Sequence, residues 1–363
     1  MKRKYLAQIE NGEPIEEDLF NTNGAILVPK GKVMTQHLRR QLLRNNIEYF
    51  LLDVTGYDGL ESHFNHFDPD TIKRIEEVKK VYTASVKNLG AEFERVRKQG
   101  NLDKVAIKEI ARELVESIGR NQQVYLGLEG IRRKDFYTYI HSIDVAIFMI
   151  VLAKSLQLSK ERQEQAAMAG LLHDIGKTRI HDSILMKPGK LTDDQMRVMQ
   201  EHSRMGHEIL AKELNYPHEI ACAALEHHER KDGTGYPRKV GWGRLHLYSQ
   251  MTAVCDIYDA ITGERVYKKA MLPHEAVEYL MTIVDTHVDR SLTNQFIRNI
   301  AVYPLGTQVT LNNHEEGMVI RLHDGFPTRP VVRVTGKGTA RDLLQEKTLM
   351  VTGVRNSREE AVG

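Results

Sequence analysis

The stretch from about Gly130 to Ala301 constrains the fold most, because it contains one helical pattern after another. Its apolar residues recur at the spacing of helix faces, and short segments rich in Gly, Pro and Asp separate the patterns. No run in it alternates convincingly as a half-buried strand does. Residues 143–152 are apolar on nearly every side, which is typical of a buried helix. We therefore predict an all-helical domain over residues 129–302.

The segments before this domain have different patterns. Residues 1–68 combine an apolar run at 25–28, a helical stretch and a strand-like run at 48–53, which predicts a small α/β module. Residues 69–128 show helical spacing, with Gly90, Gly100 and Asn101 as expected breaks between helices. We interpret this part as a helical connector, and we expect that it can carry a homodimer contact.

The pattern changes again after Tyr303 and Pro304. Short β-branched or alternating runs at 307–311, 317–322 and 330–334 are separated by Asn, Gly and Pro. They predict a small β-barrel-like module over 303–363. The predicted fold class is therefore mainly α, with small N-terminal α/β and C-terminal β modules around the helical domain.

Composition limits partners and chemistry. Lys and Arg exceed Asp and Glu by only two, so the chain has no overall field for a nucleic acid polymer or a membrane. The longest uncharged apolar run, 145–153, is too short to cross a bilayer, and we expect a cytoplasmic protein. With Cys222 and Cys255 as its two cysteines, the chain must bind any metal mainly through histidine and carboxylate.

His173 and Asp174 close an otherwise apolar predicted helix. Burying two such groups unpaired costs on the order of several kcal/mol, and a bound metal would remove that cost. Imidazole and carboxylate suit divalent cations, and a carboxylate can bridge two of them. The pair therefore predicts a metal site rather than a polar helix end.

Two further histidines are candidates with open alternatives. His141 precedes the buried helix, where a core or capping histidine is the alternative. His202 falls on the next predicted helix, which Thr192 and Gln195 start with a capping box. His207 lies on the same helix, and spacing alone does not choose between the two histidines.

The segment 227–237, HHERKDGTGYP, gives the strongest local signal. A helix ends there on paired histidines and passes into a Gly-rich turn, in which Tyr236 can present its ring to a planar base. Further along, Asp256 and Asp259 share a face of an apolar helix, with a buried salt bridge as the alternative to a metal. The basic residues that follow could hold phosphate or form a solvated face; they are Arg265, Lys268 and Lys269.

These motifs together resemble the HD-GYP family of cyclic di-GMP phosphodiesterases. The resemblance spans about Tyr137 to Ala276 and includes the His-Asp pair with Lys177, the segment from Ile184 through Lys187-Pro188-Gly189 to Thr192, and HHERKDGTGYP. It implies two divalent metal ions per chain, iron or manganese, with Asp174 as the bridge. The implied ligands are His141, His173, Asp174, His202, His227, His228 and Asp256.

The resemblance also implies the remaining site residues. Asp174, Lys177 and Arg265 are the expected catalytic residues, of which Lys177 and Arg265 contact the scissile phosphate. Tyr236 is expected beside a guanine, and Lys268 is a further phosphate contact. Asp259 also matches a family position, but the resemblance leaves open whether it binds a metal directly or lies behind a ligand.

The expected reaction is the hydrolysis of cyclic di-GMP to linear pGpG, by in-line attack of hydroxide generated at two metals. Whether hydrolysis continues to GMP is left open. Two other functions remain open. One is a cyclic-dinucleotide sensor with little or no turnover, and the other is an HD-type hydrolase of another nucleotide such as cyclic GMP-AMP.

The metal count is the first prediction. Family members with a third metal are similar in carrying a glutamate one helical turn before the first histidine, where this chain has Tyr137. A phenol with an ordinary pKa near ~10 is a poor ligand at neutral pH. Elemental analysis after anaerobic purification should therefore give two ions per chain, and a fully occupied third site near Tyr137 in anomalous diffraction would contradict this.

Overall fold

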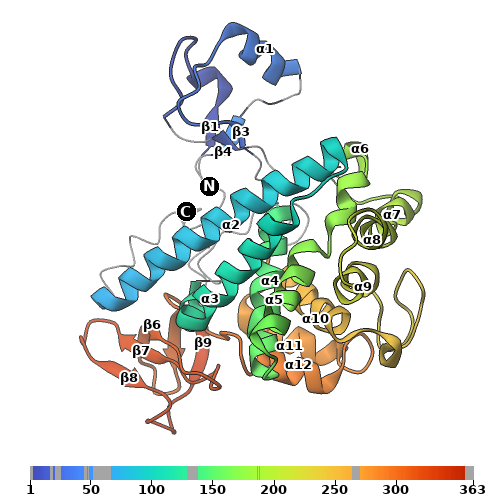
Figure 1. The fold of residues 1–363 in the computed structure, drawn as a ribbon. Coiled ribbons are helices and arrows are strands. Elements are labelled where there is room, and N and C mark those ends of the chain that lie inside the picture. The colour runs from blue at the N-terminus through green and yellow to red at the C-terminus, as the bar shows by residue number, and fades with distance from the viewer. Residues whose placement is uncertain are drawn as a thin grey trace.

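A computed structural model describes residues 3–16, 19–20, 26–44, 47, 49–51, 67–128, 138–185, 187, 189–263 and 270–355 (Figure 1). The N-terminal part is a small α/β module, as predicted. Its antiparallel strands follow the order β1-β4-β2-β3, and they bury Leu19, Val28 and Phe50 in a core separate from that of the helices. The elements are β1 (Arg3–Tyr5), a 3-10 turn η1 (Leu6–Gln8), β2 (Leu19–Phe20), β3 (Ile26–Val28), α1 (Gln36–Arg44) and β4 (Tyr49–Leu51).

Two long helices follow, α2 (Pro69–Gln99) and α3 (Lys104–Leu128). Asp68 caps α2 by accepting a hydrogen bond from the backbone N–H of Thr71, and Gly100 ends it in the left-handed conformation. The predicted break at Gly100 is confirmed, whereas the predicted break at Gly90 is wrong, because α2 continues through it. There α2 passes close to Tyr139, whose Cδ2 would lie 3.1 Å from a Cβ at position 90.

The described secondary-structure elements of the central region are all helices, as predicted. Helix α4 (Thr138–Ser155) is buried along its length and packs against α3, α5 and α10, which explains its nearly uniform apolar sequence. The other helices are α5 (Lys160–Leu172), α6 (Asp182–Leu185), α7 (Asp193–Gln200), α8 (His202–Glu208), α9 (His218–Glu226), α10 (Leu247–Thr262), α11 (Pro273–Ile283) and α12 (Arg290–Ile297). Short turns η3 (Ile175–Arg179), η4 (Ile209–Glu213) and η5 (Trp242–Arg244) connect some of them.

Helices α2 and α3 share one hydrophobic core with these central helices. The domain boundaries at 128 and 302 stay predictions. Among the described helices, none is both long enough and apolar enough to span a membrane.

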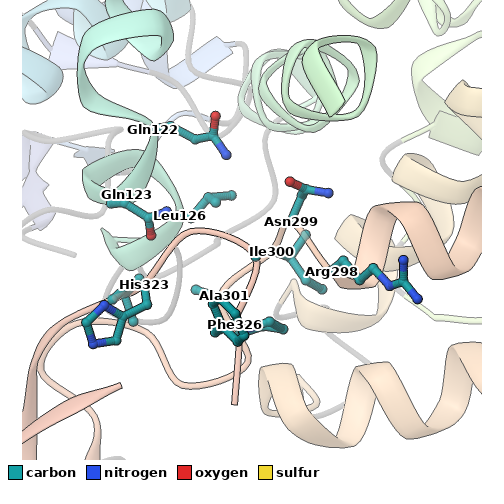
Figure 2. A pocket seen from close by; sticks show the side chains of 12 residues that line it. Gln122, Gln123, Leu126, Arg298, Asn299, Ile300, Ala301, His323 and Phe326 are labelled. Carbon is teal, nitrogen blue, oxygen red and sulfur yellow. The ribbon is translucent and has the colours of Figure 1, made fainter. Parts of the chain in front are cut away.

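The C-terminal part is an antiparallel sheet of five strands in the order β8-β7-β6-β5-β9. Its three predicted strands are confirmed, and two further ones, β8 and β9, were not predicted. The predicted barrel-like form is not confirmed, because β8 and β9 are the two edges of the sheet among the described strands. Residues of α3, of the chain after α12 and of the 322–327 loop line a small pocket, among them Gln122 and Phe326 (Figure 2). The strands are β5 (Gln308–Leu311), β6 (Glu316–Arg321), β7 (Val331–Val334), β8 (Ala340–Asp342) and β9 (Val351–Arg355).

The close approach at Gly90 gives a stability prediction. Gly90→Leu would force a side chain against the buried Tyr139 ring, and overpacking of this kind costs about 1–3 kcal/mol. Gly119→Leu on α3 is the control, because a Cβ there meets open space. Thermal unfolding should show a lower midpoint for the first variant and an unchanged or higher one for the second. Equal midpoints would show that the contact at Gly90 does not constrain the packing.

Candidate metal centre

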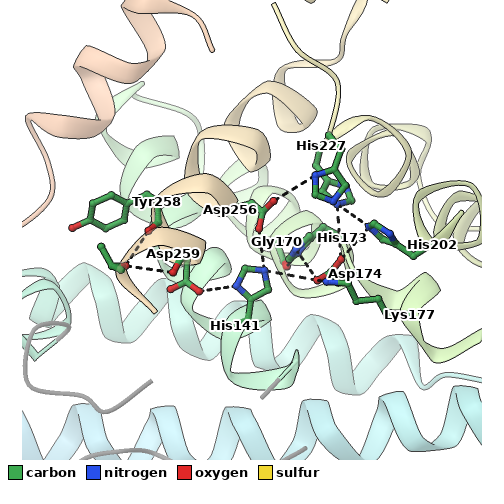
Figure 3. A network of polar contacts seen from close by, with 12 residues as sticks. His141, Gly170, His173, Asp174, Lys177, His202, His227, Asp256, Tyr258 and Asp259 are labelled. Atoms are coloured by element: carbon green, nitrogen blue, oxygen red, sulfur yellow. Dashed lines mark hydrogen bonds and ion pairs between the residues drawn. The ribbon is translucent and has the colours of Figure 1, made fainter. Parts of the chain in front are cut away.

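Five histidines and two aspartates from separate helical segments meet beside the buried helix α4 (Figure 3). His141 comes from α4, and His173 and Asp174 lie directly after α5. His202 is the first residue of α8, His227 and His228 follow α9, and Asp256 comes from α10. The structure therefore brings together all seven residues that the sequence proposed as ligands.

Asp174 lies between two groups of histidines. Its Oδ1 is 3.4 Å from His202 Nε2 and 3.9 Å from His227 Nε2. Its Oδ2 is 3.4 Å from His173 Nε2 and 3.8 Å from His141 Nε2. One carboxylate thus faces two sets of nitrogen atoms, each with a different oxygen.

Asp256 has a similar position on the other side of the cluster. Its Oδ1 is 3.1 Å from His141 Nε2, and its Oδ2 is 3.8 Å from His228 Nδ1. The seven residues include two groups of three that could each hold a cation. Asp256 lies beside both groups, because it approaches His141 of one and His228 of the other. These groups are His202, His227 and His228, and His141, His173 and Asp174.

Unpaired polar atoms test whether cations fit here. His173 Nε2 and Asp174 Oδ1 are buried and have no hydrogen-bond partner among the described residues. The Nε2 atoms of His202 and His227 face each other at 3.3 Å, but each neutral ring holds its proton on Nδ1 against a backbone carbonyl, so both Nε2 atoms are acceptors and cannot hydrogen-bond to each other. Because unpaired buried polar groups cost free energy, the donor set fits divalent cations that would take these atoms as ligands.

Backbone carbonyls orient three of the imidazole rings. The Nδ1 atoms of His173, His202 and His227 lie 2.8, 2.6 and 3.0 Å from the carbonyl oxygens of Gly170, Met199 and Ala223. Each carbonyl belongs to a residue three or four positions earlier, so local helical geometry supplies it. A proton held on Nδ1 leaves Nε2 free as a ligand.

Burial sets the protonation of the histidines. It lowers the pKa of His202 to about 4 and that of His228 to about 3, so both rings are neutral at neutral pH. His141 differs: although burial opposes its charge, hydrogen bonds to Asp256 and Asp259 raise its pKa to about 10. Although burial also opposes the Asp174 carboxylate, Lys177 and the nearby histidines hold its pKa well below the usual range.

Asp259 lies behind His141 and outside both ligand groups. Its Oδ2 is 2.6 Å from His141 Nδ1, on the side of the ring opposite the cluster. A carboxylate in this place fixes the ring and increases the basicity of Nε2. The structure thus favours the outer position that the sequence left open for Asp259.

The other predicted site residues have mixed outcomes. The ammonium group of Lys177 donates a hydrogen bond to Asp174 Oδ2, and the Tyr236 ring lies 4.6 Å from the His228 ring. His202 belongs to the cluster, whereas His207 lies outside both ligand groups, near His218 and Lys212. Arg265, Lys268 and Tyr137 lie outside the described residues.

One local prediction needs correction. The capping box at Thr192 is present, but the helix that it starts ends at Gln200, and His202 begins a separate helix. Sequence reasoning also missed the three carbonyl acceptors. Their spacing of three or four residues before each histidine is the signal that could have found them.

A helical domain with histidine and aspartate groups paired in this way defines the class of HD-type domains. The family model described as HD domain matches residues 104–292, just over half of the chain. The chain belongs to the HD domain family, in its HD-GYP branch.

Individual relatives agree with this assignment. A cyclic di-GMP phosphodiesterase of Pseudomonas aeruginosa is 36% identical over 242 residues, which cover 67% of this chain and 58% of that protein. A 3'3'-cGAMP-specific phosphodiesterase of Vibrio cholerae is 37% identical over 156 residues, 43% of this chain and 34% of the relative. The chain therefore spans little more than half, or less, of these relatives' lengths.

The fold also matches a solved structure. The HDG"Y"P protein of Bdellovibrio bacteriovorus aligns with a TM-score of 0.55 at 15% identity, covering 82% of this chain and 98% of that one. At this identity the match shows the fold alone.

Loss of the contact between Asp259 and His141 should lower the affinity for metal. Asp259→Asn removes the charge that raises the basicity of the ring, and changes of this kind typically weaken metal binding about 10- to 100-fold. Asp144→Asn is the control, because this buried carboxylate lies one turn further along α4 and accepts a hydrogen bond from Tyr82 instead. Competition with a chelator would measure both affinities. Equal affinities in the two variants would exclude the role given to Asp259.

Proposed function

We propose that this chain is a metal-dependent phosphodiesterase that hydrolyses cyclic di-GMP to linear pGpG. The observation that carries the proposal is the pair of ligand groups joined by Asp174, with Lys177 on that carboxylate and Tyr236 packed on His228. The names of the relatives support the substrate class.

One side of the cluster is open to a substrate. The side chains of His173, Asp174, His202 and His227 are sealed from solvent, with at most 2% exposed. Those of His141, Asp256, Lys177 and His228 are between 12% and 26% exposed. A phosphodiester would therefore approach from the side of these four residues.

Two bound divalent cations would neutralise phosphate charge and make water a better nucleophile at neutral pH. We propose iron or manganese for them, held by the seven residues of the cluster. Asp174 would hold the two ligand groups at a fixed separation, because each of its oxygens faces one group.

Lys177 has a different task. A protonated amine cannot be a metal ligand, and its side chain is 25% exposed at the open side of the cluster. From the edge of Asp174 its ammonium group can donate to a non-bridging phosphate oxygen, where charge increases in the transition state. Arg265 would add a second donor and Lys268 a further phosphate contact, by the sequence pattern alone.

Tyr236 would receive a guanine. Its ring tilts 34° from that of His228, and the residue is half-buried, so part of the aromatic surface stays open. Base stacking on an aromatic ring is worth about 1–3 kcal/mol per base. The same ring covers the metal ligand His228, which joins base recognition to the metal cluster.

Cyclic GMP-AMP is the second candidate substrate, because a relative at 37% identity is named for it. We propose a cytoplasmic location for the chain, and the homodimer contact through α2 and α3 stays a prediction.

Incubation of the purified, metal-loaded protein with each dinucleotide, with products separated by chromatography, would test the proposed reaction and its substrate. We expect pGpG from cyclic di-GMP at the higher kcat/KM. Binding without product would favour a sensor, and faster cyclic GMP-AMP cleavage would change the substrate.

Lys177→Met predicts a loss of rate without a loss of metal. The substitution keeps the length of the side chain and removes its charge, so kcat should fall about 100-fold while metal content stays at the wild-type value. Lys212→Ala, which removes an exposed lysine paired with Glu208, is the charge-matched control and should keep full activity. Normal kcat in Lys177→Met, or a loss of bound metal, would remove Lys177 from the mechanism.

A further inference from the structure

Glu229 is a buried carboxylate that directly follows the paired histidines. It is 2% exposed, and it accepts three backbone hydrogen bonds. Its Oε1 accepts from the N–H groups of Arg238 at 2.6 Å and Lys239 at 3.1 Å, and its Oε2 accepts from Val240 at 3.2 Å. Hydrogen bonds to an ionised acceptor are about twice as strong as neutral ones, so Glu229 firmly holds the segment 238–240.

That segment is the return limb of the turn that carries Tyr236. The turn folds back on its own start: the Tyr236 N–H donates to the carbonyl of His228 at 3.2 Å. Gly235 lies so close that a Cβ there would be 2.5 Å from Glu229 Cα. The chain before Tyr236 is thus fixed by close backbone packing, and the chain after Pro237 is fixed by Glu229.

Other contacts hold different parts of the turn. The N–H groups of Lys231 and Asp232 donate to His287 and Thr286, which fixes the outgoing limb. On the return limb, Arg204 donates to the carbonyl of Pro237 from an exposed position, and the Arg238 side chain pairs with Glu226. Among the described residues, Glu229 is the buried side chain that holds the backbone of this limb at three successive N–H groups.

We propose that Glu229 is a positioning residue for substrate recognition, which holds Tyr236 against His228 so that its open ring surface can receive a guanine base. The inference rests on the proposed function. The Glu229 carboxylate binds the backbone of residues 238–240 and belongs to neither ligand group, so we expect it to act through the placement of Tyr236.

Glu229→Gln tests this with little change of shape. A glutamine places an NH₂ group against at least one backbone N–H, because one of its two terminal atoms is a donor. We expect KM for cyclic di-GMP to rise about 10-fold with kcat nearly unchanged. Hydrolysis of bis(p-nitrophenyl) phosphate, a phosphodiester without a guanine base, should keep its kcat/KM within about twofold, because the metal ligands stay in place.

A double-mutant cycle with Tyr236→Ala gives the direct readout. If Glu229 acts through Tyr236, then Glu229→Gln raises KM for cyclic di-GMP in the wild-type background and has no further effect in Tyr236→Ala. Ser117→Ala is the control for stability, because it removes a buried hydrogen bond that Tyr125 donates to Ser117 within α3, away from the turn. It should lower the unfolding midpoint and leave KM unchanged.

A second variant covers a failure of Glu229→Gln to fold. Glu229→Asp keeps the charge but is one methylene shorter, and KM should shift in the same direction. An equal loss with both substrates, or an effect of Glu229→Gln that persists in Tyr236→Ala, would overturn the proposal. If the wild type cleaves bis(p-nitrophenyl) phosphate but only binds cyclic di-GMP, the proposed reaction is wrong. The double-mutant cycle would then be measured from the Kd for cyclic di-GMP in place of KM. If cyclic di-GMP does not bind at all, both the proposed reaction and the role of Glu229 are overturned.

Discussion

The buried carboxylate of Asp174 is the constraint on which the site depends. It lies 3.4 to 3.9 Å from four histidine nitrogens, and burial would penalise its charge without positive partners. Lys177 supplies one positive charge, but Oδ1 still has no hydrogen-bond partner among the described residues. The proposed cations would complete this balance. The helix ends must therefore converge on Asp174, and each ring must turn its free nitrogen toward it.

The helices meet this demand through two kinds of contact. Carbonyl oxygens near helix ends hold the rings of His173, His202 and His227 from behind, and Asp259 holds His141. The long helix α2 supports α4 on both sides of His141. Tyr139 packs on Phe93 with ring centroids 5.4 Å apart, and Asp144 accepts a hydrogen bond from Tyr82. The helix next to the N-terminal module thus contacts the chain immediately around a proposed ligand.

Most of this arrangement could be predicted from sequence because ionisable residues in apolar helices need partners. His173, Asp174 and Asp256 stood out for that reason, and family resemblance supplied the grouping of all seven residues. The failures have physical causes. Gly90 breaks an isolated helix pattern but is tolerated inside α2, because its missing side chain admits Tyr139. Strand β9 pairs with the distant strand β5, which local patterns do not encode. Strand β8 pairs with its neighbour β7, but its three residues, Ala340, Arg341 and Asp342, show no apolar alternation. The three bonds of Glu229 join residues that only the folded turn brings together.

Turnover as a function of bound metal tests the central claim most directly. Metal-free protein would be titrated with iron or manganese under anaerobic conditions, and cyclic di-GMP hydrolysis would be measured at each number of ions per chain. The geometry around Asp174 predicts little turnover at one equivalent and full pGpG formation at two, because both ligand groups must be filled. Full activity in metal-free protein, or a plateau at one equivalent, would contradict the paired site.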